Sequence, residues 1–311
     1  MTGPVPPEDK RFYYSLLPFI GVSMIVVLVL AAVLAYYSLP AVKKYGATAI
    51  LGREWSPSED NPSKARYGLL IPILGTLATA TIAVLIGLPI ALSMVVLTEE
   101  ILPYRYRGLL GSIVDVMAAI PTIVYGLWGL TVLAPLLRET LYKWLHARLG
   151  WTPLFACNPF TGTTYMTAGI LLGIIVVPYI YAIVREAYRS VPKKYRHGIY
   201  ALGATRLEAV RLIMGMIRSA IAAAVLLAFG RAAGETVAVA LVIGSAFNAP
   251  RCLLAPGYTI ASLIANQFGE SFYYPYMANA LYLGGLLLLL IGIAANIAGL
   301  RLLGRARSLE G

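Results

Sequence analysis

The sequence predicts an all-α integral membrane protein with six transmembrane helices. Hydrophobic residues make up 59% of the 311 residues and charged residues only 13%, and the mean hydropathy is +0.77. Soluble domains carry roughly 25% charged residues, so this chain falls outside that class. Several runs without a charged residue exceed the roughly 20 residues that cross a bilayer as a helix. The clearest are Phe12–Val42, Tyr67–Thr98 and Ser271–Leu300.

The six spans are expected, in chain order, at residues 14–38, 69–97, 111–137, 165–187, 217–244 and 276–300. The first span follows Lys10 and Arg11, as the apolar part of a signal peptide would. It is too long for that, because such a region has about 7–15 residues, so we expect a retained first helix. The predicted organisation is a tail at 1–13, a first helix with its loop at 14–66, and a core of five helices at 67–311.

The distribution of basic residues predicts that both termini are cytoplasmic. With the N-terminus inside, the inner segments hold 15 Lys and Arg and the outer loops hold 9, while Arg231 lies within a span. Cytoplasmic loops carry the excess of Lys and Arg in membrane proteins. The net charge of +11 then fits contact with anionic lipid better than nucleic-acid binding.

The two cysteines, Cys157 and Cys252, fall on the same outer side in this topology. They are either two unrelated thiols or a disulfide, which an oxidising compartment permits. Neither they nor the two histidines form a CxxC or HExxH cluster. We therefore expect no metal site and no cofactor.

The long basic loop between the fourth and fifth spans, about residues 188–216, is predicted to form two short amphipathic helices joined at Gly203. Pro192 suits the start of the first helix. The pattern alone leaves two interpretations open. The loop lies on lipid headgroups as a basic interfacial element, or it docks a partner protein.

Two charges, Arg231 and Glu235, lie within the fifth predicted span. Arg231 is about 14 residues into it, or roughly 21 Å at 1.5 Å per residue, which is near mid-membrane. A charge there costs on the order of 3 kcal/mol. Residues four apart share a helical face, so the two charges are expected to be able to pair. They either lock helices together or serve a transport path.

The third predicted span holds further candidates. Pro121 is expected to bend it. Asp115, near its start, is favoured there by the helix dipole. Thr122 and Tyr125 are weaker candidates for lining a path, since small polar residues also pack membrane helices.

Several stretches resemble one transporter family. "YALGATRLEAVRLI" looks like the coupling-loop motif of ABC-transporter permeases, with Gly203 and Ile213 at matching positions, although His197, Gly198 and Ile199 depart from it. "AAIPTIVYGLWGLTVLAP" and "GRAAGETVAVALVIG" resemble spans of phosphate-specific ABC permeases. "TIASLIANQFGES" and "WLHARLGWTPLF" resemble the PstC type of subunit.

This resemblance implies an ABC importer type I permease fold whose coupling loop meets a cytoplasmic ATPase. The loop residues implied are Tyr200, Ala201, Leu202, Gly203, Ala204, Thr205 and Ile213. It further implies that Arg231 and Glu235 lie on the path of phosphate. The implied partners are a PstA-type permease, PstB-type ATPase subunits and a PstS-type phosphate-binding protein.

The chain itself is not expected to be an enzyme, because it contains no GxxxxGK[ST] motif to hold ATP phosphates. Three alternatives remain at this point. The substrate is another oxyanion such as sulfate, molybdate or tungstate; the protein is an ATP-independent secondary transporter; or it is a membrane scaffold or sensor that transports nothing.

Overall fold

Four helices in the described part of the chain are long and apolar enough to cross a membrane. The computed structural model describes residues 7–58, 61 and 63–308. The helices are α1 (Pro7–Tyr45), α3 (Leu70–Val96, continued by a π-helical turn at Leu97–Ile101), α8 (Tyr165–Ser190) and α14 (Met277–Ser308). Two further spans follow if each of two bent helix pairs is one crossing, which gives the six that the sequence predicts.

The first bent pair confirms the predicted role of Pro121. α4 (Tyr104–Ala119) ends just before it, and the following helical segment leaves at 88° to α4. Pro121 has no N–H, so the carbonyl of Met117 four residues earlier loses its helical donor. The hydroxyl of Tyr125 donates to that carbonyl instead, at 2.8 Å. The segment beyond the bend comprises α5 (Thr122–Trp128), α6 (Ala134–Leu137) and α7 (Lys143–Leu149), with π-helical turns at Gly129–Leu133 and Arg138–Tyr142.

The predicted fifth span, residues 217–244, is not one continuous helix. α10 (Arg206–Met216) and α11 (Arg218–Ala233) meet at 67°, and α11 ends before Gly234. Helix resumes only at α12 (Val237–Val242). Glycine has a low helix propensity. The Thr236 hydroxyl also donates to the carbonyl of Gly234 at 3.3 Å, a local bond that competes with helix. The predicted span is therefore broken.

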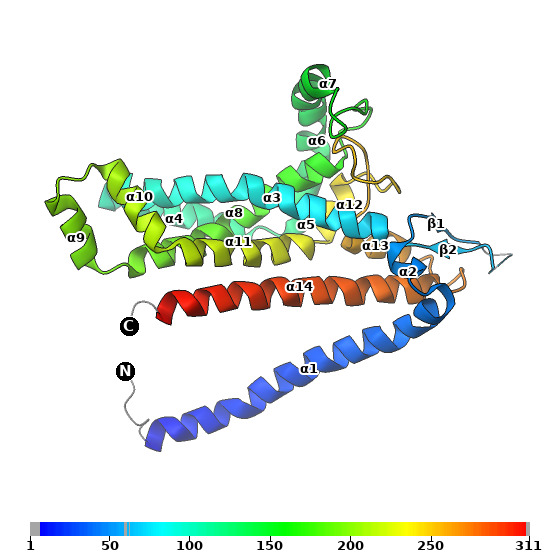
Figure 1. Ribbon diagram of the computed structural model, residues 1–311, viewed down its shortest axis with the longest axis horizontal. Helices are drawn as coiled ribbons and strands as arrows, with labels where there is room; N and C mark the ends of the chain where they lie inside the picture. Colours follow the sequence, from blue (N-terminus) through cyan, green and yellow to red (C-terminus); the bar gives the residue numbers. More distant parts are fainter. Residues whose placement is uncertain (1–6, 59–60, 62, 309–311) are drawn as a thin grey trace.

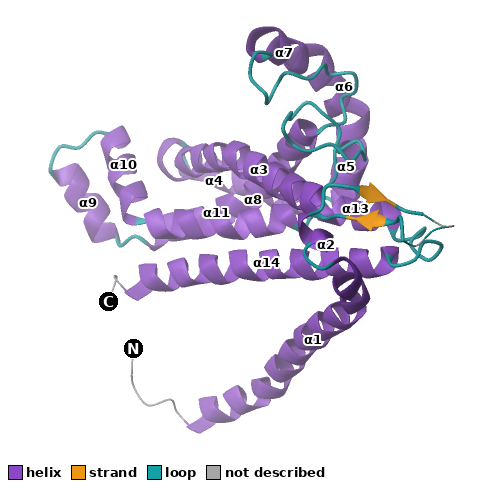
Figure 2. Cartoon of the chain, turned by 45° about the vertical axis from the view of Figure 1, so that its right-hand side comes forward, coloured by secondary structure: helices purple, strands orange, loops and turns teal. Residues whose placement is uncertain are grey.

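α8 is the central helix of the bundle, and α1 is peripheral. In Figure 1, α3, α8 and α11 lie together and α14 runs beside α11. Small residues allow this close packing: a Cβ at Gly169 of α8 would come within 2.5 Å of Ile82 Cγ2 on α3. The apolar part of α8 is largely buried, whereas that of α1 is exposed. Figure 2 shows α1 diverging from α14 toward its N-terminal end.

The bundle has two distinct ends (Figure 1). The α9–α10 end carries α9 (Lys193–Ala201) and α10, and the N-terminal end of α1 and the C-terminal end of α14 lie toward it. The α7 end carries α2 (Thr48–Leu51), α13 (Ile260–Gln267), α7, and a hairpin in which β1 (Trp55–Ser56) pairs antiparallel with β2 (Arg66–Tyr67). At the α7 end Cys157 and Cys252 are joined by a disulfide.

The basic loop at the α9–α10 end forms the two short helices expected from the sequence. They are joined at Gly203, whose φ of +83° lies in the left-handed region that favours glycine. Thr205 and Glu208 form a reciprocal capping box at the start of α10. Leu202 is 90% exposed and Leu207 is 79% exposed. The connection thus presents apolar side chains on an ordered turn.

Candidate functional site

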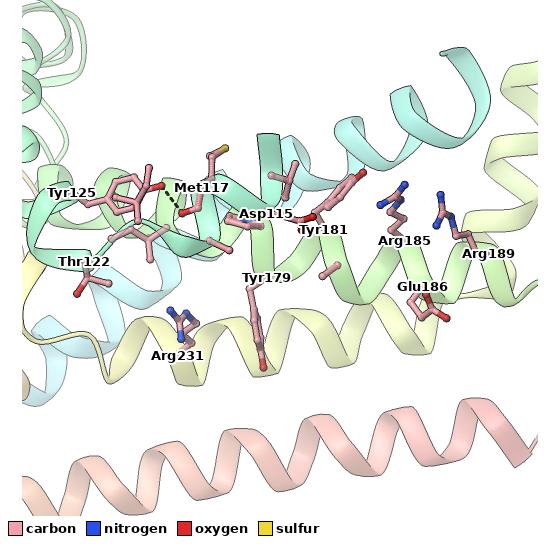
Figure 3. A pocket seen from close by; sticks show the side chains of 16 residues that line it. Asp115, Met117, Thr122, Tyr125, Tyr179, Tyr181, Arg185, Glu186, Arg189 and Arg231 are labelled. Atoms are coloured by element: carbon pink, nitrogen blue, oxygen red, sulfur yellow. Dashed lines mark hydrogen bonds between the residues drawn. The ribbon is translucent and has the colours of Figure 1, made fainter. Parts of the chain in front are cut away.

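A cavity of about 420 Å³ lies where α4, α5, α8 and α11 meet. Three arginines line it: Arg185 and Arg189 from α8, and Arg231 from α11 (Figure 3). We call it the arginine cavity. Asp115 and Glu186 also line it, and both are exposed. Because guanidinium groups present forked donors that match the oxygens of tetrahedral anions, the cavity is chemically suited to an oxyanion.

Arg231 stands in the last turn of α11. The helix dipole places partial negative charge at that end, which favours a cation. The guanidinium carbon of Arg231 lies 5.9 Å from the ring centroid of Tyr179 on α8, within the range of a cation–π contact. The sequence predicts Arg231 in the middle of a continuous helix, but α11 ends two residues after it. The end of the helix therefore helps to accommodate its positive charge.

Glu235 is not on a shared helical face with Arg231, contrary to the expectation from their spacing. It lies beyond the end of α11, and among the described residues no ion pair joins the two side chains. Both residues nevertheless line a second depression, beside the arginine cavity, together with Tyr179 and Asn296. Arg231 thus borders both hollows, and Glu235 borders only the second.

Thr122 and Tyr125 both line the arginine cavity. Thr122 is the first residue of α5, directly after the bend. The hydroxyl of Tyr125 is already engaged with the Met117 carbonyl, so Tyr125 shapes the bend as well as the wall. By contrast Thr76 and Thr79 are fully buried and donate to backbone carbonyls within α3, which is a packing role.

Glu99 is a buried carboxylate, 6% exposed, in the π-helical turn that ends α3. Its Oε1 accepts hydrogen bonds from Arg185 Nε at 2.8 Å and from Arg189 Nε at 2.9 Å. Arg107 Nη1 of α4 lies 3.9 Å from its Oε2. A single carboxylate therefore faces three guanidinium groups, two of which line the cavity.

Glu100, the next residue, binds the end of α8 and the first helix of the basic loop, α9. Its Oε1 accepts from the hydroxyl of Tyr188 at 2.6 Å and lies 3.5 Å from Arg196 Nη1. Its Oε2 accepts from the hydroxyl of Tyr200 at 3.1 Å. Burial first, and then the negative charge of Glu100, raise the pKa of Tyr200, so this phenol remains a donor at neutral pH. α9 is thereby attached to the end of α3.

Glu99 and Glu100 are not among the site residues expected from the sequence. Arg185, Arg189 and Arg196 enter there only within the 15 basic residues of the inner segments. The available signal was two adjacent carboxylates closing an apolar run in a chain that has 14 acidic residues in total. Charged groups at the end of such a run need partners, and the basic loop is the richest source of them.

The seven residues predicted for the coupling loop fall into two groups. Most of those from Tyr200 to Thr205 are exposed around the turn at Gly203. Ile213 is fully buried against the helix bundle. Ile213 therefore anchors α10, whereas the members of this set around the turn are available as a contact surface.

The chain resembles known transport proteins. Residues 102–307 match the family described as binding-protein-dependent transport system inner membrane component. The chain is 46% identical to the probable phosphate transport system permease protein PstC of Methanocaldococcus jannaschii, over 96% of this chain and 94% of that protein. It is 35% identical to the phosphate transport system permease protein PstC of Xylella fastidiosa, over 96% of this chain and 93% of that protein.

A solved structure shows the same fold. A chain of the MetNI methionine ABC transporter, in an inward facing conformation, superposes with a TM-score of 0.50 and 19% identity. The match covers 73% of this chain and 93% of that one. The predicted fold class, a multi-pass helical permease of the ABC importer kind, is thereby confirmed. The chain belongs to the binding-protein-dependent transport system inner membrane component family, and is of the same PstC type as these relatives.

Proposed function

We propose that this chain is the permease subunit of an ATP-driven phosphate importer and forms half of its translocation path. The observation that carries the proposal is the arginine cavity, where three guanidinium groups line one hollow between two broken helices. Relatives named as phosphate transport permeases support phosphate as the anion. The chain makes and breaks no covalent bond in this scheme.

The exposed surfaces of the chain and the family to which it belongs support a set of partner proteins. A PstA-type permease completes the path, and PstB-type ATPase subunits, which hydrolyse the ATP, dock at the turn around Gly203. A PstS-type binding protein delivers phosphate from outside, and lipid surrounds the spans. The exposed side chain of Leu202 and the ordered Gly203 turn support docking there.

The proposed docking of ATPase subunits at the Gly203 turn implies an orientation in the membrane. The α9–α10 end is cytoplasmic, so both termini are cytoplasmic, and the disulfide lies outside, where oxidising conditions preserve it. The excess of basic residues at the α9–α10 end supports the same orientation.

Within the path, Arg231 holds the anion, and Thr122 and Tyr125 form part of the wall. Glu235, which borders Arg231 from the second depression, limits how tightly the arginine holds the anion. ATP-driven closure of the ATPase pair moves the docking helices and switches the path between outward and inward access.

The test is labelled phosphate uptake into vesicles that contain the assembled complex, with and without ATP. ATP-dependent uptake that excess sulfate does not inhibit, and that Arg231→Gln abolishes, supports the proposal. Arg301→Gln, an exposed arginine near the end of α14, is the matched control and leaves uptake unchanged. Uptake that sulfate, molybdate or tungstate suppresses assigns another oxyanion. Uptake that follows an ion gradient without ATP indicates a secondary transporter. Uptake unchanged in Arg231→Gln contradicts the path.

A further inference from the structure

Arg185 and Arg189 line the same cavity as Arg231 but lie further toward the cytoplasm. They follow Tyr179, the residue beneath Arg231, by six and ten positions on α8, which is about 9 and 15 Å along the helix axis. Being four residues apart, they share one face of α8. Figure 3 shows both projecting on the side of Tyr181, while Glu186 points away on another side.

The Arg185 guanidinium is held in a defined position. Its Nε donates to Glu99, and its carbon lies 5.4 Å from the ring centroid of Tyr181. It also rests against Gly111 of α4, where an added Cβ would lie 3.3 Å from Nη1. Both arginines use Nε to bind Glu99. Within the described chain, their terminal nitrogens donate to no protein acceptor, so these donors are available.

The charges around Glu99 do not balance locally. One carboxylate faces Arg107, Arg185 and Arg189, which leaves two positive charges in excess around a buried group. Asp115 and Glu186 also face the cavity, but both are exposed and neither pairs with these arginines among the described residues. A partly buried positive excess beside a cavity attracts an anion.

We propose that Arg185 and Arg189 form a second station for the tetrahedral oxyanion at the cytoplasmic end of the cavity. In the structure Glu99 holds both guanidinium groups through Nε, so an arriving anion first meets their terminal nitrogens and then competes with the carboxylate for the two groups. The anion and Glu99 exchange places as the anion passes. The inference rests on the proposed function, since it takes the anion at Arg231 to be the transported one.

This exchange predicts different transport defects for loss of the two arginines and for loss of the Glu99 charge. Carboxylates and phosphates compete for the same guanidinium donors. Without the arginines the anion has no place to move to after Arg231, so inward movement slows. Without the charge of Glu99 the anion is not displaced, so it stays bound. A purely structural bridge predicts neither effect, only loss of assembly when either side is removed.

The experiment uses the full complex in vesicles and in detergent, with inorganic phosphate as the probe. Arg185→Gln combined with Arg189→Gln is expected to lower the uptake rate by at least about tenfold, the range of a lost charge-assisted bond. ATP hydrolysis continues in this variant. Glu99→Gln is expected to raise phosphate retained by the ATP-free complex by a similar factor. Arg301→Gln serves again as the matched control.

The outcomes separate the two proposals. If wild type imports phosphate and Arg231→Gln does not, but the double variant imports at the wild-type rate, the second station is overturned and the proposed function stands. If wild type imports no phosphate, the proposed function fails. If the double variant does not assemble, the half-exposed Arg189→Gln alone and the Glu99→Gln retention measurement decide, and unchanged values in both overturn the station.

Discussion

Glu99 and Glu100 are neighbours in sequence but hold different parts of the molecule. Glu99 binds the two arginines of α8 that line the cavity. Glu100 binds Tyr188 of α8 and also binds α9 through Arg196 and Tyr200. Because the two residues are adjacent in one π-helical turn, we expect a displacement of α9 to be passed on to the arginines that line the cavity.

Glu100→Gln is therefore expected to uncouple ATP hydrolysis from transport. The amide keeps the shape but loses the charge that holds Arg196. Phosphate moved per ATP hydrolysed should fall by about fivefold or more, the range of a typical coupling energy. Both rates are measured on the same vesicles. Glu270→Gln, an exposed carboxylate that follows α13 at the opposite end of the bundle, is the control. An unchanged ratio in Glu100→Gln excludes this route of coupling.

Tyr200→Phe should lower the same ratio less, because it removes one neutral donor from Glu100. The raised pKa of Tyr200 keeps its phenol protonated as pH rises, so the wild-type ratio should stay constant between about pH 7 and 9. A ratio that falls over this range in wild type, but not in Tyr200→Phe, would show that the phenol ionises and that the predicted direction is wrong.

The bend at Pro121 gives a paired prediction. Tyr125→Phe leaves the Met117 carbonyl without its donor and should destabilise the protein by about 1 kcal/mol, seen as a lower unfolding temperature. Pro121→Ala restores an N–H that can donate to the same carbonyl, so α4 and α5 can straighten. That variant should assemble but import less phosphate. Full import by Pro121→Ala would show that the bend is not needed.

Glu235 is expected to set the choice between phosphate and sulfate. Phosphate retains a proton at neutral pH and can donate it to a carboxylate, whereas sulfate cannot. Glu235→Gln should therefore lower the preference for phosphate over sulfate by at least about tenfold. Competition between labelled phosphate and sulfate measures it. An active variant with wild-type preference would falsify this role.

The bond between Cys157 and Cys252 closes a segment of 95 residues. Removing a native disulfide typically costs about 2–5 kcal/mol. Cys157→Ser with Cys252→Ser should therefore unfold at a lower temperature than wild type. A reducing agent should lower the wild-type value and leave the variant unchanged. Mass spectrometry under non-reducing conditions provides the direct check, and two free thiols there would contradict the bond.

Local chemistry explains what the sequence could predict. Pro121 lacks a donor and Gly203 accepts a left-handed backbone wherever they occur, so the bend and the turn follow from the residues themselves. The break at Gly234 was missed because it interrupts an apolar run whose composition is that of a continuous span. The spacing of Arg231 and Glu235 then suggested a pair that the actual backbone does not form.

The Glu99–Glu100 contacts could not be predicted in the same way. Apart from Arg107, their partners lie 86 to 100 residues away in the chain, and nothing in the local sequence indicates which arginine meets which carboxylate. Only the packing of α3 against α8 brings them together. The cavity likewise depends on four helices whose relative positions no periodicity encodes.

The fixation of α8 at both ends has a mechanical consequence. At the α7 end, Tyr165 and Met166 donate backbone hydrogen bonds to the carbonyls of Ala255 and Leu253, in the loop that the disulfide secures. At the α9–α10 end, Glu99 and Glu100 hold it to α3. A helix held in this way is expected to move less than its neighbours. α4–α5 and α11, which are interrupted at Pro121 and at Gly234, are then the walls expected to move most.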